Sequence, residues 1–347
     1  MSFDRTGFSR INAAGVPKPH GLYNPAYEHD SCGVGFVARL NATADHAIVD
    51  HAVSVLVNLE HRGAIGGDKS TGDGAGLLLQ IPDAFFRYGC RDLGFPLPPR
   101  GQYAAGLVFL PTDEDLADRC VHTFERVAAE EGCPVLGWRP VPVNPDPLGD
   151  LARMTKPAIR QCFLSCGAFA GDAFERKLYV IRRLAEKEVR SWADGDASQF
   201  YVPSLSSRTI VYKGLLTGSQ LNVFYPDLRD PSFASAFAVV HQRFSTNTLP
   251  TWHLAHPFRF LAHNGEINTL RGNINRMRAR EAILESDRFG DDLEKIKPVI
   301  LEEGSDSAIF DNALELLVMG GRSLPHAMMM MVPEAFGAKF HMSEDKR

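Results

Sequence analysis

The residues of greatest chemical interest in this chain are a thiol, two guanidinium groups, a carboxylate and an Asn-Gly pair. They are Cys32, Arg62, Arg243, Asn264, Gly265 and Asp306. Arg243 stands in a polar cluster, HQRFSTNT, at the end of one expected strand, and AHNGE brings Asn264 and Gly265 to the end of another, at a helix start. Backbone N–H groups at a helix start point outward and can receive negative charge. Taken singly, each residue has an ordinary explanation as a buried thiol, a surface arginine or a turn. Taken together, they form one chemistry.

A glycine-rich loop raises the question of phosphate binding. Residues 63–76, GAIGGDKSTGDGAG, contain six glycines, which let backbone N–H groups approach an anion. A P-loop needs glycine directly before Lys-Ser, and here Asp68 precedes Lys69. The segment does not fit GxGxxG either, so we favour a tight active-site or packing loop.

Two weak metal motifs are present. His253 and His256 have a spacing of three that suits one helical face, but Pro257 follows directly and no Glu, Asp or Cys stands at ligand spacing. Cys162 and Cys166 form a similarly weak pair. We therefore expect structural histidines, core thiols and no metal.

The segment 271–281, RGNINRMRARE, carries four arginines on an expected helix. A solvated helix face is the usual explanation, docking to another domain or subunit is a second, and nucleic-acid binding is the least favoured. The net charge of -5, from 37 Lys plus Arg against 42 Asp plus Glu, argues against a polyanion partner.

The elements that position these residues follow from the apolar periodicity. Strands are expected at residues 32–40, 77–81, 104–110, 135–143, 206–214, 233–245, 256–264 and 324–333. Helices are expected at residues 46–61, 113–132, 174–192, 265–284 and 307–319. Hairpin-like neighbouring strands mixed with helices indicate an α+β sandwich rather than a doubly wound parallel sheet.

The two ends of the chain are expected to differ from its centre. Residues 1–31 are rich in Pro, Gly, His and Asn and lack periodicity, so we interpret them as a leader draped over the surface. The ending FHMSEDKR comes soon after an expected core strand and has no terminal cap, which suggests a fragment of something longer. No apolar run suits a membrane span or a secretory signal, and six scattered cysteines suit a reducing compartment, so we expect a cytoplasmic protein without disulfides.

Five ordered motifs then carry a family resemblance. They are DSCGVGF, LEHRGAIGGDKSTGDGAG, HQRFSTNTLPTW, FLAHNGEINTLRGN and EEGSDSAIFDNALELL. From about Tyr23 onward the chain resembles the amidotransferase domain at the N-terminus of the large subunit of bacterial glutamate synthase. The wider family, the class II glutamine amidotransferases, are N-terminal-nucleophile (Ntn) hydrolases, so the resemblance implies a four-layer αββα sandwich over residues 32–347.

The resemblance implies that Cys32 is the nucleophile and becomes the first residue after cleavage behind Ser31. Residues 1–31 would then be a propeptide. An α-amino group titrates near pH 7.7–8.0, so a terminal cysteine carries its own general base. By the same resemblance, the Asn264 side-chain amide and the Gly265 N–H form the oxyanion hole, where losing one donor costs about 10²–10³ in rate.

The remaining site residues are implied to hold glutamine. Arg243 would clamp the substrate α-carboxylate with its planar guanidinium, and Asp306 would receive the α-ammonium group. Thr246 would add a hydroxyl contact, and Arg62 would order the site near the nucleophile. Two opposite charges would distinguish free L-glutamine from a simple amide.

The resemblance also implies a larger enzyme. In the family, FMN, an iron–sulfur cluster and the 2-oxoglutarate site belong to parts of the large subunit that this chain does not contain, and a small subunit oxidises NADPH. This chain would perform only the glutaminase half-reaction, with the bacterial NADPH type nearer than the ferredoxin type. Alternatives are another class II amidotransferase serving a sugar phosphate or asparagine synthesis, an inactive assembly module and, more distantly, a metal-dependent hydrolase using His253 and His256.

Overall fold

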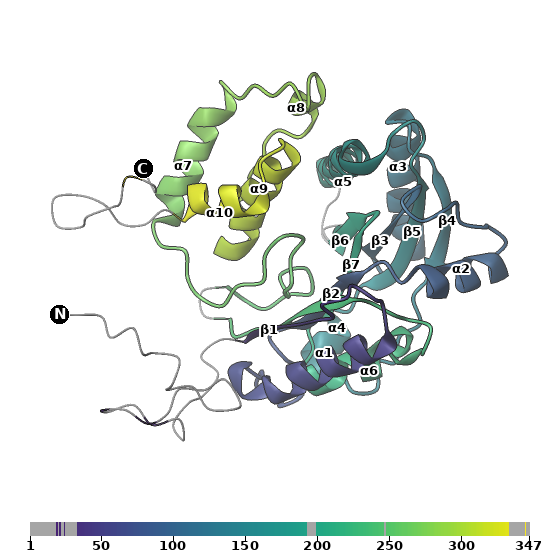
Figure 1. The fold of residues 1–347 in the computed structure, drawn as a ribbon, viewed down its shortest axis with the longest axis vertical. Coiled ribbons are helices and arrows are strands. Elements are labelled where there is room, and N and C mark those ends of the chain that lie inside the picture. The colour runs from purple at the N-terminus through teal and green to yellow at the C-terminus, as the bar shows by residue number, and fades with distance from the viewer. Residues whose placement is uncertain are drawn as a thin grey trace. The chain divides into compact units, whose positions relative to one another are not determined.

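The computed structural model describes residues 33–192, 199–245 and 248–332, together with Pro19, Gly21, Asn24 and Glu344. Cys32, Thr246 and all but three residues of the expected leader lie outside the described residues. Within them the protein is a mixed α+β fold with two antiparallel four-stranded sheets, as the sequence pattern predicts (Figure 1).

The first sheet carries the strands that lead to the site. Its order is β1 (Val34–Ala38), β8 (Phe237–Gln242), β2 (Ala75–Gln80) and β7 (Thr209–Gly214). The register places His241 opposite Gly76, and Gly76 opposite Lys213. Residues directly opposite in antiparallel strands point to the same face. His241 and Lys213 therefore share one face of this sheet.

The other face of the first sheet is packed in the main hydrophobic core. Leu77 and Val240 lie on it beside Leu56 of α1 (His46–Asn58), and all three are fully buried. Asp45 begins the helix, because its carboxylate accepts a hydrogen bond from the Ala47 N–H at 2.9 Å. The helix expected at residues 46–61 is confirmed, with its last residues in the 3-10 helix η3 (Glu60–Arg62).

The second sheet belongs to a βαββαβ unit. Its order is β4 (Val135–Pro140), β5 (Ala158–Ser165), β3 (Tyr103–Leu110) and β6 (Tyr201–Ser206). Along the chain, α3 (Glu114–Glu130) joins β3 to β4 and α5 (Gly171–Trp192) joins β5 to β6, while the short α4 (Asp150–Met154) lies between β4 and β5. Both long helices pack on one face of the sheet in a second core (Figure 1).

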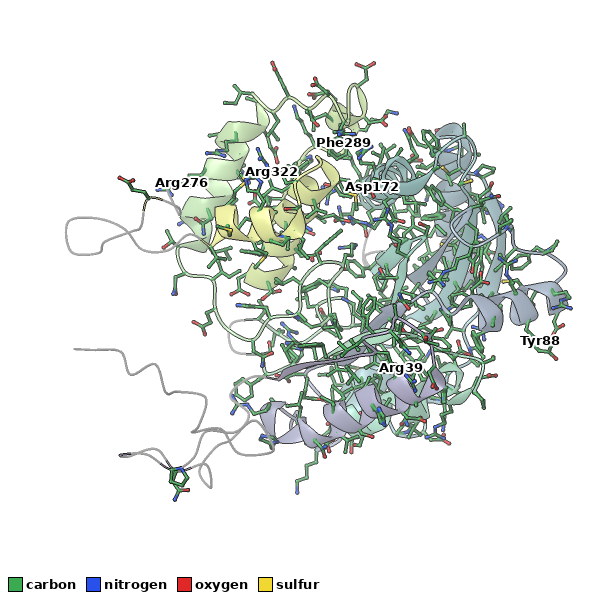
Figure 2. All side chains as sticks on the ribbon, in the orientation of Figure 1. Arg39, Tyr88, Asp172, Arg276, Phe289 and Arg322 are labelled. Carbon is green, nitrogen blue, oxygen red and sulfur yellow. The ribbon has the colours of Figure 1, made fainter. Side chains whose placement is uncertain are left out.

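The last described part of the chain is helical. It contains α7 (Leu270–Glu281), α8 (Asp292–Lys295), α9 (Asp306–Met319) and α10 (Leu324–Met331). A third core joins α7, α8 and α9 to α5. In it Phe289, labelled in Figure 2, packs edge-on against Tyr179 with ring centroids 6.0 Å apart. None of the described helices is both long enough and apolar enough to cross a bilayer.

Two expected strands are wrong. Residues 324–333 contain α10 instead, because Ser323 caps a helix whose first turn holds Pro325 and which continues in good helix formers. Residues 256–264 form no regular element. Pro257 has no N–H for a ladder, and buried side chains take up the neighbouring backbone groups, as shown below.

Several elements were not anticipated from the periodicity. They are α2 (Asp83–Asp92), β5, β6, α4, α8 and the short α6 (Leu221–Phe224). The helix expected at 265–284 begins only at Leu270. Gly265 is therefore not at a helix start, contrary to the expectation from the AHNGE motif.

Candidate active site

Gly33, the first residue of the continuous described stretch, lies beside Asn264. The Gly33 carbonyl accepts a hydrogen bond from the Gln242 N–H at 2.7 Å, at the end of β8. A Cβ added to Gly33 would lie 2.3 Å from the Gln242 carbonyl oxygen and 2.9 Å from Asn264 Nδ2. Only glycine fits there, and the Asn264 amide lies against the backbone that directly follows Cys32. Cys32 itself lies outside the described residues.

Lysine supports the irregular backbone that leads to Asn264. The Lys213 Nζ donates hydrogen bonds to the carbonyls of Ala255 at 2.6 Å and His253 at 2.8 Å. Lys213 is fully buried, and burial lowers its pKa well below the usual range. No carboxylate pairs with it among the described residues, so its function here is to bind the two carbonyls.

Histidine holds the residue before Asn264. His241 Nε2 lies 3.0 Å from the His263 carbonyl oxygen, and because a carbonyl only accepts, this nitrogen carries the proton. The His241 ring stacks on His256 with centroids 4.3 Å apart. Burial lowers the pKa of His241 to about 3, although the His263 carbonyl and the nearby Asn264 side chain oppose that shift. The ring is therefore neutral near pH 7.

Of the two histidines weighed as metal ligands, His256 is buried and His253 is partly buried. His256 packs between His241 and Phe258, and His253 Nδ1 lies 3.3 Å from the Thr251 hydroxyl. The part of the chain that the structure describes brings together no group of three or more His, Cys, Asp or Glu side chains able to hold a metal.

Arg243 directly follows β8 and is only 5% exposed. Its backbone N–H binds the Gly74 carbonyl at 2.8 Å, and its Nη2 donates to the Thr248 hydroxyl at 2.8 Å. Its Nη1 is buried and has no hydrogen-bond partner among the described residues. Burial lowers the pKa of Arg243, while the carboxylates of Asp73 and Asp306 act in the opposite direction. The group remains a cation with one nitrogen that has no hydrogen-bond partner among the described residues, which suits a carboxylate ligand.

Asp306 is the first residue of α9, after the N-cap Ser305. Its Oδ2 accepts a hydrogen bond from the Ile267 N–H at 2.8 Å, and its Oδ1 accepts one from the Ser307 N–H at 2.6 Å. The carboxylate is close enough to Arg243 to influence its pKa. The structure thus brings Arg243, Asp306 and the segment after Asn264 to one place.

The glycine-rich loop packs behind Arg243. Ala64 N–H donates to the Arg243 carbonyl at 3.2 Å, and the Asp68 carboxylate turns the loop by accepting from the Thr71 N–H at 2.8 Å. Gly74 has a φ of +141°, and a Cβ there would lie 2.9 Å from the Ala255 Cβ. This is the tight packing loop that the sequence favours over a phosphate loop.

Of the two further predicted site residues, Arg62 and Thr246, the structure describes only Arg62. Arg62 ends η3, and the next residue, Gly63, lies so close to Gln242 that a Cβ there would be 2.2 Å from its Nε2. Arg62 therefore lies next in sequence to a residue that contacts Gln242 at the end of β8, and its ordering role at the nucleophile stays a prediction. Thr246 lies outside the described residues, so its hydroxyl contact stays a prediction.

Two residues of the site were missed from the sequence. Asp73 lies in the glycine-rich loop, and its Oδ2 accepts a hydrogen bond from the Ser245 N–H at 2.6 Å, two residues after Arg243. Lys213 was the other. A lysine inside the apolar run TIVYKG of an expected strand was the available signal for it.

The remaining candidates behave as ordinary structural residues. The four arginines of α7 are exposed, and Figure 2 shows one of them, Arg276. Arg278 forms an ion pair with Glu302. The five described cysteines are free thiols, of which Cys162 is fully buried and Cys166 is partly exposed.

Comparison with protein families gives a match over nearly the whole chain. The family model described as "Glutamine amidotransferases class-II" matches residues 32–347. The match begins at Cys32 and includes every site residue described above.

Curated relatives are also similar over most of this chain. It is 51% identical over 334 residues to the NADPH-type glutamate synthase large chain of Bacillus subtilis, covering 96% of this chain and 22% of that protein. It is 48% identical over 333 residues to the NADH-type glutamate synthase of Saccharomyces cerevisiae, covering 92% and 15%. It is 44% identical over 311 residues to the ferredoxin-dependent glutamate synthase 2 of Synechocystis, covering 89% and 20%. The chain thus spans about a fifth of the length of these relatives.

Proposed function

Because the chain belongs to the class II glutamine amidotransferases, we propose that it hydrolyses L-glutamine to L-glutamate and ammonia through a γ-glutamyl thioester on Cys32. The observation that carries this proposal is the position of Asn264. Its Nδ2 lies against Gly33, the residue next to Cys32, where an amide donor can stabilise an oxyanion formed on a substrate bonded to residue 32.

The two charges near Asn264 support an amino-acid substrate. The buried Nη1 of Arg243 has no protein partner among the described residues and would bind the α-carboxylate. Asp306 would bind the α-ammonium group with lone pairs that remain beyond its two backbone hydrogen bonds. Thr246 and Arg62 would complete the binding site, as the family resemblance implies.

The proposed mechanism begins with removal of residues 1–31. The family match from residue 32 onward supports this boundary. The freed α-amine of Cys32 takes the thiol proton, and the thiolate attacks the glutamine carboxamide carbon while Asn264 Nδ2 and the Gly265 N–H bind the oxyanion. The protonated amine then gives its proton to the departing ammonia. Water cleaves the thioester with the same amine as base, which restores the thiol.

The same family membership leads us to propose the four-layer αββα arrangement. The first sheet, with its core face against α1 and its other face toward the site, is the layer that this arrangement requires at the nucleophile. The βαββαβ unit supplies the second sheet, and of its strands and long helices the sequence pattern missed only β5 and β6.

We further propose that the ammonia serves glutamate formation from 2-oxoglutarate in a larger cytoplasmic enzyme. The names of the relatives support this role, and the 51% identity to an NADPH-type large chain favours NADPH as donor through a small subunit. FMN and the iron–sulfur cluster would belong to parts outside this chain. The described thiols are dispersed and form no group able to hold a cluster, and the proposed glutaminase mechanism requires no cluster.

The intact mass of the purified chain, before and after exposure to an electrophilic glutamine analogue, tests the proposal. We expect a chain that starts at Cys32 and gains one analogue, and a Cys32→Ala variant that gains none and produces no ammonia from glutamine. A chain that retains Met1 and gains nothing would favour an inactive assembly module instead. Near-normal turnover by Cys32→Ala would exclude the thioester mechanism.

A further inference from the structure

The residues that carry the proposed oxyanion donors lie in a short segment with little support of its own. Residues 260–267 contain Asn264 and Gly265 and form no helix or strand. On one side, residues 257–262 line a cavity of about 680 Å³, which they share with Glu315, Val318 and Met319 of α9. Packing alone therefore does not hold this segment from all sides.

Both ends of the segment are bound by one helix. The Phe260 N–H donates to Oδ1 of Asp311 at 2.9 Å, and the Ile267 N–H donates to Oδ2 of Asp306 at 2.8 Å. Asp306 and Asp311 are five residues apart on α9, which is about 7.5 Å along the helix axis. A rigid helix thus sets the separation between the two ends of the segment.

The helix is itself fixed by buried charges. Arg259 lies beside Asp311, with Nη1 3.6 Å from Oδ2, and beside Glu186 of α5, with Nη2 3.6 Å from Oε1. Arg182 of α5 pairs with Glu186 at 3.0 Å and also pairs with Glu315 of α9. Asp311 is fully buried, so its carboxylate cannot exchange the Phe260 amide for water without local opening.

We propose that Asp306 and Asp311 act together as a clamp on residues 260–267, which makes Asp311 a positioning residue for the donors on Asn264 and Gly265. Asp311 touches neither the substrate nor the reacting atoms. Its effect on turnover rests on the proposed function, whereas the clamp itself is a statement about the backbone and can be tested without any activity.

The test compares two replacements of the same carboxylate. Asp311→Asn and Asp311→Leu both remove the charge, but only asparagine keeps an oxygen that can accept from the Phe260 N–H. Glu315→Gln is the matched control, because it removes a carboxylate from the same buried network of α9 without a hydrogen bond to the segment. The readouts are kcat, KM for glutamine and amide hydrogen exchange across residues 260–269.

We expect Asp311→Leu to lower kcat by about 10- to 100-fold relative to Asp311→Asn, with a much smaller change in KM. Exchange at residues 260–267 should accelerate in the leucine variant, while exchange in α1 stays unchanged. Glu315→Gln should keep both its kcat and the slow exchange of the segment. Equal kcat and equal exchange in the two Asp311 variants would overturn the proposal.

A measurement on the unmodified chain covers the case in which Asp311→Leu does not fold. The Phe260 and Ile267 amides should exchange much more slowly than the exposed residues of the glycine-rich loop, and exchange at the loop rate would overturn the clamp. If the unmodified chain produces no ammonia but these two amides are protected, the proposed function fails while the clamp stands.

Discussion

The βαββαβ unit and the segment that carries Asn264 hold their backbones in opposite ways. In the unit, β3 pairs with β5 over eight residue pairs, so backbone groups satisfy one another. Between residues 253 and 267 there is no ladder, and backbone groups bind one another in local turns, such as the Phe258 N–H to the Leu261 carbonyl at 2.8 Å. Four buried or partly buried side chains bind other carbonyls and N–H groups of this stretch. These are Lys213, His241, Asp306 and Asp311. A ladder tolerates most single substitutions, whereas each of these side chains is an individual support.

Buried polar atoms without a partner among the described residues occur in both regions, including Arg183 Nε in α5, but in the irregular region they belong to candidate site residues. Arg139 in β4 donates from Nη1 and Nη2 to the two oxygens of Asp227, both at 2.8 Å. Arg243 and Asn264 each keep a buried polar atom without a partner among the described residues. An unpaired buried group lowers stability unless a ligand completes it. The irregular region therefore trades stability for binding capacity.

The largest difference between the two regions is expected when the effect of replacing Asn264 on kcat is compared with that of a substitution in the βαββαβ unit. We expect Asn264→Ala to lower kcat for glutamine hydrolysis by about 10²–10³-fold, because one oxyanion donor is lost. Leu178→Ala, at a fully buried position of α5, should leave kcat unchanged and lower the free energy of unfolding by about 2–5 kcal/mol. Steady-state kinetics and urea denaturation of both variants measure the two effects.

The comparison fails if the two variants behave alike. An Asn264→Ala protein that loses stability and activity in proportion would mean that this side chain supports the fold rather than the reaction. A Leu178→Ala protein with impaired kcat would mean that α5 transmits packing changes to the site.

Replacing an arginine by lysine should also have different effects on KM in the two regions. Arg243→Lys should raise KM for glutamine by about 10- to 100-fold, because a lysine cannot present a planar pair of donors to the α-carboxylate. Arg139→Lys should lower stability and leave KM unchanged, since its bidentate partner is Asp227. Initial rates over a range of glutamine concentrations check both, and an unchanged KM in Arg243→Lys would argue against its binding role.

The difference between the regions also explains which predictions were right. Apolar periodicity identified β3, α3 and α5, because a ladder or an amphipathic helix repeats one pattern over many residues. It gave a wrong strand at 256–264, because that backbone depends on single contacts from residues distant in sequence, such as Lys213 and Asp311. The candidate residues Arg243, Asn264 and Asp306 came from motifs, while Asp73 and Lys213 have no pattern that announces their partners.

The two regions also differ in how a buried lysine makes the stability depend on pH. Burial lowers the pKa of Lys213 in the folded chain, whereas in the unfolded chain this pKa is about 10.5. At pH values between the two, the unfolded chain binds a proton that the folded chain does not, so the free energy of unfolding rises with pH. Lys213→Met should remove this contribution, up to about 1.4 kcal/mol per pH unit. The measurement is the urea midpoint of both proteins from pH 6 to 10.

Lys177 in α5 is the matched control. Although burial opposes it, hydrogen bonds with Asp292 and Glu131 raise the pKa of Lys177. Its contribution is therefore present below about pH 10.5 and is lost as pH rises through the raised value. Between pH 6 and 10 Lys177 is protonated in both the folded and the unfolded chain, so Lys177→Met should leave the slope of the pH profile unchanged, and a slope change equal to that of Lys213→Met would contradict the contrast.

Of these residues, His241 should contribute least to the pH dependence of stability near neutral pH. Its pKa of about 3, lowered by burial, means that the unfolded chain takes up a proton below about pH 6.5 while the folded chain does not. This residue therefore contributes nothing to the pH dependence at pH 7.5, and its stability contribution is lost progressively as pH falls from about 6.5 toward 3. His241→Gln keeps a donor for the His263 carbonyl and should flatten the acid side of the stability profile. His122→Gln, on the exposed side of α3, should not. Urea denaturation between pH 4 and 8 compares them, and equal acid sensitivity of His241→Gln and the unmodified chain would show that the buried imidazole is not what links this region to pH.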